Sequence, residues 1–106
     1  MLNYESCNYI NVDAVLNDLV AHDSNGYYKF VRIKGEYRFA EVLCSHDSLA
    51  IGEVAETAAF VKIETKNGKR IGRLSGHSLS LKIGYDAMDI ILLPELLEFE
   101  LDWDIS

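Results

Sequence analysis

Hydrophobic positions recur with a helical period in one segment near the N-terminus, residues 11–23. Its apolar side chains are spaced i, i+3, i+4, i+7 and i+8, which places them on one face of a helix. Asn11 can cap the first turn, Asp13 suits the positive end of the helix dipole, and the turn cluster at 23–26 ends the segment. The pattern therefore predicts an amphipathic helix over 11–23, with a weaker helical candidate at 53–59.

The pattern then changes to the composition and alternation typical of strands. Segments 27–33 and 37–44 flank the tight turn Lys34-Gly35-Glu36, and segments 60–65 and 70–75 flank a turn centred on Asn67-Gly68. Asn-Gly between two such segments is the strongest short hairpin signal. Further strands are expected in the alternating segment 79–83 and in the apolar run 89–93, with Pro94 ending the latter.

These elements predict one α+β domain over residues 1–106. We expect an N-terminal helix packed on a curled, mainly antiparallel sheet or small barrel of about six to eight strands. A chain of 106 residues suffices for a single hydrophobic core.

The most regular alternation in the chain covers residues 97–105, LEFELDWDI. Apolar residues take the odd positions, and Glu98, Glu100, Asp102 and Asp104 take the even ones. Because side chains alternate across a strand, this pattern predicts a strand with four carboxylates on one face and Phe99 and Trp103 on the other.

The charge of the whole chain is concentrated in the same region. Residues 1–82 contain ten basic and ten acidic side chains, whereas residues 83–106 contain seven acids and no Lys or Arg, which accounts for the net charge of −7. Phosphate would be repelled from such a surface, so nucleic acid as a direct ligand and an anionic membrane are both disfavoured. The seven acids are Asp86, Asp89, Glu95, Glu98, Glu100, Asp102 and Asp104.

Three interpretations of this acidic strand are open. Its outer face could simply be solvated, which also discourages edge-to-edge pairing. It could instead be neutralised by a neighbouring basic hairpin, on which Lys66 faces Lys69 and Lys62 faces Arg73. Finally, it could bind a basic partner, either through the carboxylates or by strand addition at a sheet edge along 97–105.

The remaining candidates for chemistry are weak. Cys7 and Cys44 lack metal-binding spacing and are expected to be reduced thiols. The His-Asp dipeptides at His22 and His46 fall in turn-like positions, and the sequence around His77 lacks the last glycine of a nucleophile elbow. We therefore expect no catalytic site, no cofactor and no metal.

The sequence thus favours an acidic, cytoplasmic protein-binding module. The first 12 residues show no signal peptide, and no apolar run is long enough to span a membrane. We expect an immunity protein or inhibitor that covers the positive cleft of a basic nuclease toxin, with the seven acids as partner-binding residues. The alternatives are a phage-type nucleic-acid mimic that blocks a defence nuclease, a small structural or assembly subunit, and an unrecognised small enzyme or ligand binder. A homodimer is also possible.

Overall fold

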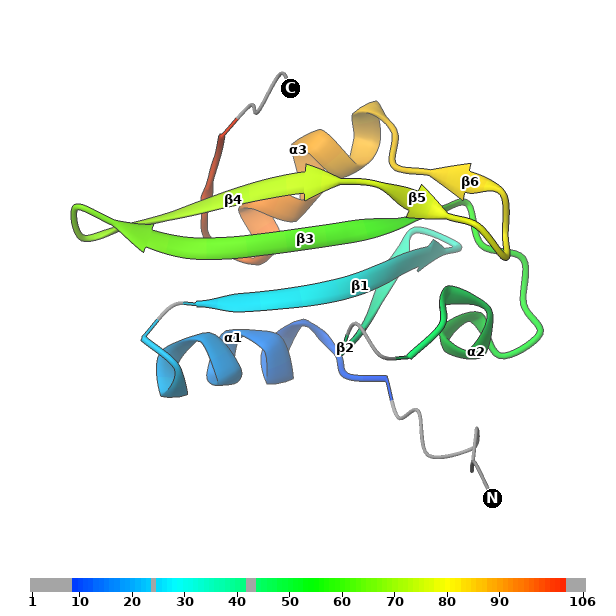
Figure 1. The fold of residues 1–106 in the computed structure, drawn as a ribbon, viewed down its shortest axis with the longest axis horizontal. Coiled ribbons are helices and arrows are strands. Elements are labelled where there is room, and N and C mark those ends of the chain that lie inside the picture. The colour runs from blue at the N-terminus through cyan, green and yellow to red at the C-terminus, as the bar shows by residue number, and fades with distance from the viewer. Residues whose placement is uncertain (1–8, 24, 42–43, 103–106) are drawn as a thin grey trace.

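The computed structural model describes residues 9–23, 25–41 and 44–102, which form three helices and seven strands (Figure 1). Their order along the chain is α1 (Val12–Ala21), β1 (Gly26–Ile33), β2 (Glu36–Glu41), α2 (His46–Ala50), β3 (Thr57–Lys66), β4 (Lys69–Ser75), β5 (His77–Ser78), β6 (Ile83–Gly84), α3 (Ala87–Leu96) and β7 (Glu100–Leu101).

The predicted α+β class is confirmed, but the details differ. Five strands form one sheet in the order β2-β1-β3-β4-β7, and β5 pairs with β6. All pairs are antiparallel except β4–β7, so the larger sheet is mixed. The strands of the described residues form open sheets rather than a barrel, and they are accompanied by three helices instead of one.

Both predicted hairpins are present. Asn67 and Gly68 have φ values of 52° and 80°, and Lys34 and Gly35 have similar values of 53° and 78°. Two consecutive left-handed residues match the twist of the flanking strands in a two-residue hairpin. The turn fixes the register as predicted, with Lys62 opposite Arg73.

The predicted N-terminal helix is also confirmed as α1. The Asn11 side chain accepts a hydrogen bond from the backbone N–H of Ala14 at 2.9 Å, which caps the helix. Val15 and Leu19 are fully buried and attach α1 to the sheet.

The prediction of a strand at 89–93 is wrong, because this run lies in α3. Asp86 caps the helix by accepting from the N–H groups of Met88 and Asp89, and the Asp89 carboxylate accepts from the Asp86 N–H. This reciprocal capping box stabilises the first turn despite the β-branched residues that follow. Pro94 lies inside the helix, near its end, rather than before a strand.

Two other predicted elements are wrong. The helix expected at 53–59 is absent, and the short α2 lies instead at His46–Ala50, capped by Ser45. The strand expected at 79–83 is mostly the turn between β5 and β6.

The strand predicted at 97–105 is not continuous over its described part, residues 97–102. Glu98 has φ of 55°, which is a left-handed conformation that interrupts any alternation. Among the described residues 97–102, only Glu100–Leu101 forms a strand, β7, which lies parallel to β4 at the edge of the sheet. Trp103 and Asp104, with the rest of residues 103–106, lie outside the described residues.

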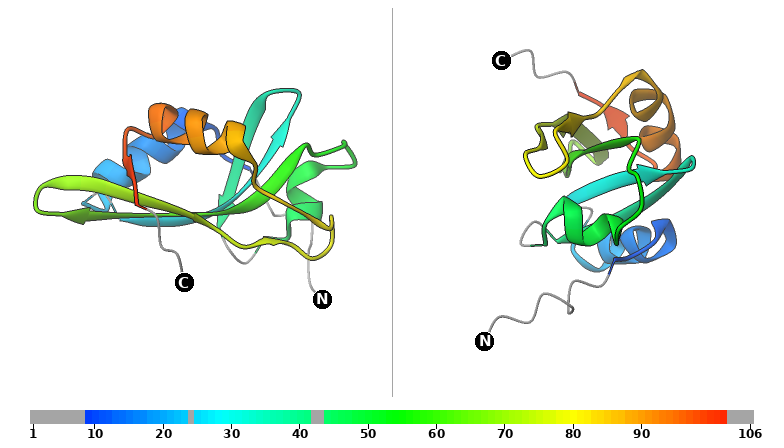
Figure 2. Two further views of the ribbon diagram at one scale, coloured as in Figure 1. Left: turned by 90° about the horizontal axis from the view of Figure 1, so that it is seen from above. Right: turned by 90° about the vertical axis from the view of Figure 1, so that its right-hand side faces the viewer.

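Helices cover the two faces of the sheet unequally (Figure 2). On one face, α1 and α3 pack over a core that includes Phe30, Phe39, Val61 and Ile63. On the other face, α2 covers only one end, over Val31, Ile33, Ala40 and Ala58. We call these the helix-covered face and, where α2 does not reach, the open sheet face.

Candidate functional site

The C-terminal acids that were predicted to face a partner are partly engaged within the chain. Asp102 accepts hydrogen bonds from Arg73, with a closest N–O distance of 3.1 Å, and Glu100 lies 3.6 Å from the Lys69 ammonium. This is the internal pairing with the basic hairpin that the sequence left open. Glu98 is exposed and unpaired in the described part of the chain.

The acids on α3 have three different environments. Glu95 is exposed on the outer side of the helix. Asp86 caps α3 and pairs with Arg32, while its side chain remains 49% exposed. Asp89 is fully buried, so the structure places this predicted partner-binding residue where it cannot reach a partner. The partner-binding role of the surface acids stays a prediction.

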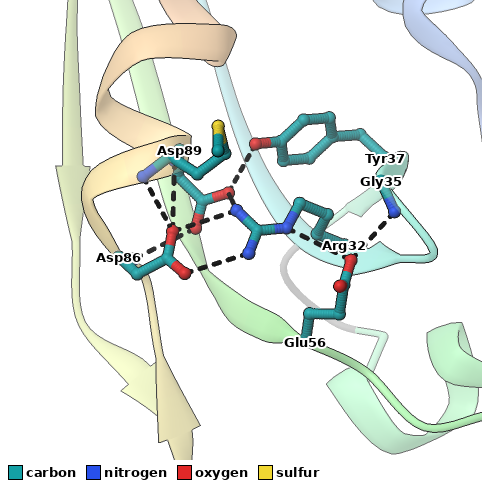
Figure 3. A network of polar contacts seen from close by, with 7 residues as sticks. Arg32, Gly35, Tyr37, Glu56, Asp86 and Asp89 are labelled. Carbon is teal, nitrogen blue, oxygen red and sulfur yellow. Dashed lines mark hydrogen bonds and ion pairs between the residues drawn. The ribbon is translucent and has the colours of Figure 1, made fainter.

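Arg32 is the centre of a polar network between β1 and the start of α3 (Figure 3). Its guanidinium donates two hydrogen bonds of 2.9 Å to the Asp86 carboxylate and one of 2.9 Å to Asp89. A third acid, Glu56, accepts from Nε at 3.3 Å and from the N–H of Gly35 at 2.8 Å. The network therefore joins α3, the β1–β2 turn and the segment before β3.

Tyr37 completes this network on its buried side. Its hydroxyl donates to Asp89 Oδ1 at 2.5 Å. Burial, followed by the hydrogen bond to Asp89, raises the pKa of Tyr37, which keeps the hydroxyl protonated as a donor. The Arg32 guanidinium lowers the pKa of Asp86, so that acid is ionised at neutral pH. Every group is satisfied internally, and the network is a structural clamp rather than an open site.

Two acids outside the C-terminal segment, Asp13 and Glu36, line a different surface. A groove of about 400 Å³ lies between the start of α1, the β1–β2 turn and the end of α3. Asp13 and Glu36 line it together with the apolar side chains of Val12 and Leu96, and no Lys or Arg does. Within the described residues neither acid has a cationic partner. We call it the helix groove; no sequence motif marked it, because its walls come from three distant segments.

The histidines differ in exposure and in their polar contacts, and one cysteine is in a disulfide bond. His22 is the exposed residue that follows α1 and lies 3.2 Å from Asp18, and His77 is exposed in β5. His46 is buried and its Nε2 donates to the Ala59 carbonyl oxygen at 2.8 Å. Cys44 is disulfide-bonded, so the prediction of a reduced thiol there is wrong, and Cys7 lies outside the described residues.

The described residues show neither a metal-binding cluster nor a membrane-spanning helix. No group of three or more His, Cys, Asp or Glu side chains in residues 9–23, 25–41 and 44–102 is arranged to hold a metal ion. Of the three described helices, none has the length and apolar character to span a membrane. In comparisons with known proteins, no family model, no curated protein and no solved structure matches this chain.

Proposed function

We propose that this protein is a binding module for a basic protein, and that it acts as an immunity protein or inhibitor of a nuclease-type toxin. The observation that carries the proposal is the helix groove, in which Asp13 and Glu36 lie without cationic partners beside the apolar Leu96. An arginine or lysine side chain of a partner suits such a groove. Its alkyl stem can pack on the apolar wall while its charged end meets a carboxylate.

The charge of the whole molecule supports fast association with such a partner. A net charge of −7 in a chain of 106 residues attracts a positive nuclease cleft over several ångströms and raises the association rate. The exposed Glu95 and Glu98 add to this field and are not engaged by described cations. Glu100 and Asp102 would first have to leave Lys69 and Arg73, so we assign them a smaller part.

Binding to purified nuclease domains of high isoelectric point tests this proposal. Biolayer interferometry at 50 and 300 mM NaCl would measure affinity, and a basic protein without nuclease activity would serve as the reference. We expect a cognate nuclease to bind more tightly than the reference and to lose activity when bound. The double variant Asp13→Asn/Glu36→Gln should weaken binding by about tenfold for each charged hydrogen bond that is lost, because each contributes ~1.5 kcal/mol or more.

A matched variant on the C-terminal segment distinguishes the two acidic regions. Glu100→Gln/Asp102→Asn removes the same number of charges but acts on carboxylates that are already paired. It should mainly slow association. A larger loss of affinity in this variant would assign the contact to the C-terminal segment. Equal binding of the nuclease domains and the reference protein would refute the proposal.

A further inference from the structure

The open sheet face carries a second surface, on the side away from α1 and α3. The pairing register places alternate residues of β1, β3 and β4 on this side, and α2 reaches one of them, Phe60, through His46. They are Tyr27 and Lys29 on β1, Phe60, Lys62, Glu64 and Lys66 on β3, and Lys69, Ile71 and Arg73 on β4.

The strand register arranges these side chains as alternating rings and cations. Tyr27 lies opposite Lys62, which lies opposite Arg73 in the next strand. One row further along, Lys29 lies opposite Phe60. Neighbours across strands are within side-chain contact, so each ring is next to a positive charge.

The surface is cationic, in contrast to the molecule as a whole. It presents five Lys or Arg side chains, whereas its acids are Glu64 and, from the neighbouring C-terminal segment, Glu100 and Asp102. The hydrogen bond from Lys62 lowers the pKa of Glu64, and the charges of Lys66 and Arg73 lower it further. Exposed ion pairs of this kind are weak, so a phosphate can replace the carboxylates.

The two rings form a supported stacking platform. Their centroids are 5.8 Å apart with an interplanar angle of 28°. Phe60 also contacts Lys29, whose ammonium is 5.7 Å from the ring centroid, and His46, whose ring lies nearly perpendicular with its centroid 5.2 Å away. Tyr27 is 48% exposed. Beside Tyr27 and Lys62 lies a groove of about 630 Å³, whose polar lining includes Asn25.

We propose that the open sheet face binds single-stranded nucleic acid. A base stacks on Tyr27, the backbone phosphates contact Lys62, Lys66 and Arg73, and the groove beside Asn25 receives the edge of a neighbouring base. Aromatic rings on a basic sheet suit unpaired bases, whose flat faces are inaccessible inside a duplex. An acidic peptide would use the cations but would leave the exposed ring without a role. The acids that flank this surface, Glu100 and Asp102, pair with Lys69 and Arg73, whereas Asp13, Glu36 and Glu95 lie on other elements.

Fluorescence anisotropy with labelled 12-nucleotide oligo(dT) and oligo(U) at 50 mM NaCl tests this proposal. We expect saturable binding of at least one oligonucleotide, and comparison of the two identifies the preferred sugar. Tyr27→Ala should weaken binding roughly 5- to 150-fold, the range given by loss of one base stack. Tyr27→Phe should retain it. Lys62→Gln/Lys66→Gln should reduce the slope of log affinity against log salt by about 0.7 for each lost phosphate contact.

Control variants test whether oligonucleotide binding depends on the open sheet face and not on the helix groove. Competing ligands test whether a duplex or an acidic polypeptide binds there instead. Asp13→Asn/Glu36→Gln should leave oligonucleotide binding intact, so the two surfaces can fail independently. Circular dichroism of each variant verifies folding. The proposal is overturned by the absence of saturable binding, by equal affinity for a 12-base-pair duplex, or by an unchanged affinity in Tyr27→Ala. If polyglutamate competes with the oligonucleotide and Tyr27→Ala binds the oligonucleotide with unchanged affinity, the surface would be assigned to an acidic polypeptide.

Discussion

Both faces of the sheet carry ion pairs between a basic residue and an acid, but the two sets of pairs differ in exposure. On the helix-covered face, the Arg32 side chain is 10% exposed and Asp89 is fully buried. On the open sheet face, the side chains of Lys69 and Glu100 are 68% and 65% exposed, and Lys62 pairs with Glu64 and Arg73 with Asp102 at the surface. The cover of helices, rather than the residue types, decides the environment of each pair.

This difference decides what each pair can do. A buried charge cannot be released without a large desolvation penalty, so the Arg32 network can hold α3 in place but cannot serve a ligand. An exposed pair contributes little to stability, so its members are available to an incoming anion or cation. The functional proposals therefore concern the exposed charges, and the stability predictions concern the buried ones.

The largest effect is expected from breaking the buried network. Arg32→Ala leaves the fully buried Asp89 carboxylate without its cation and removes the link from α3 to β1. Loss of one partner from a buried pair costs about 3–5 kcal/mol of unfolding free energy. Urea denaturation at pH 7 followed by circular dichroism measures this change.

Lys62→Ala is the matched control on the open sheet face, since it also removes one cation from an ion pair. Its partner Glu64 remains solvated, so the unfolding free energy should change by less than ~1 kcal/mol. Similar destabilisation by both substitutions would show that the two faces do not differ in the way inferred here.

The second effect concerns packing on the helix-covered face. Gly72 of β4 lies under the Phe99 ring, and a Cβ atom built there would be 2.4 Å from Phe99 Cδ1. Gly72→Ala should therefore displace the ring and cost about 1–3 kcal/mol, as expected for overpacking. Gly84→Ala is the control, because its Cβ would meet its nearest neighbours at an ordinary 3.5 Å. Equal denaturation midpoints for the two variants would contradict the tight packing of Phe99.

Local signals were sufficient for part of this architecture. The Asn67-Gly68 turn specified its hairpin, and with it the pairing of Lys62 with Arg73 on the open sheet face. Asn11 likewise marked the start of α1. In each case neighbouring residues contain the whole signal, because a turn type or a helix cap is fixed within about four residues.

The rest depends on contacts between distant segments. Arg32 and Asp86 are 54 residues apart, so nothing local indicated that these side chains meet. The run 89–93 has no polar side to reveal a helical period, and its β-branched residues favour a strand on propensity alone. The Asp86/Asp89 capping box was visible in the sequence, and would have been the signal for α3.

A smaller, pH-dependent effect is expected at the end of the sheet that α2 covers. Burial lowers the pKa of His46 below 6.5, so the folded protein holds this imidazole neutral. Below about pH 6.5 the unfolded chain binds a proton that the folded chain does not, and stability must fall, by at most ~1.4 kcal/mol per pH unit. The His46→Gln variant should therefore lose less unfolding free energy between pH 7 and pH 5 than the unmodified protein. Urea titration at each pH measures this free energy.

His77→Gln provides the comparison for the pH prediction, because His77 is an exposed residue on β5. Its pH profile should follow that of the unmodified protein. If His46→Gln follows the same profile, the neutral buried imidazole is not the source of the pH dependence.

The smallest effect is expected at the edge of the open sheet face, where Lys69 and Glu100 pair across β4 and β7 at 3.6 Å. Both side chains are about two-thirds exposed, so water and salt screen their attraction. A double-mutant cycle with Lys69→Gln and Glu100→Gln should give a coupling energy below ~0.5 kcal/mol that disappears in 0.5 M NaCl. A coupling of ~2 kcal/mol or more would mean that this pair fixes β7 to the sheet as firmly as the buried network fixes α3. The exposed charges would then be structural, and the availability of the open sheet face to a ligand would lose its physical basis.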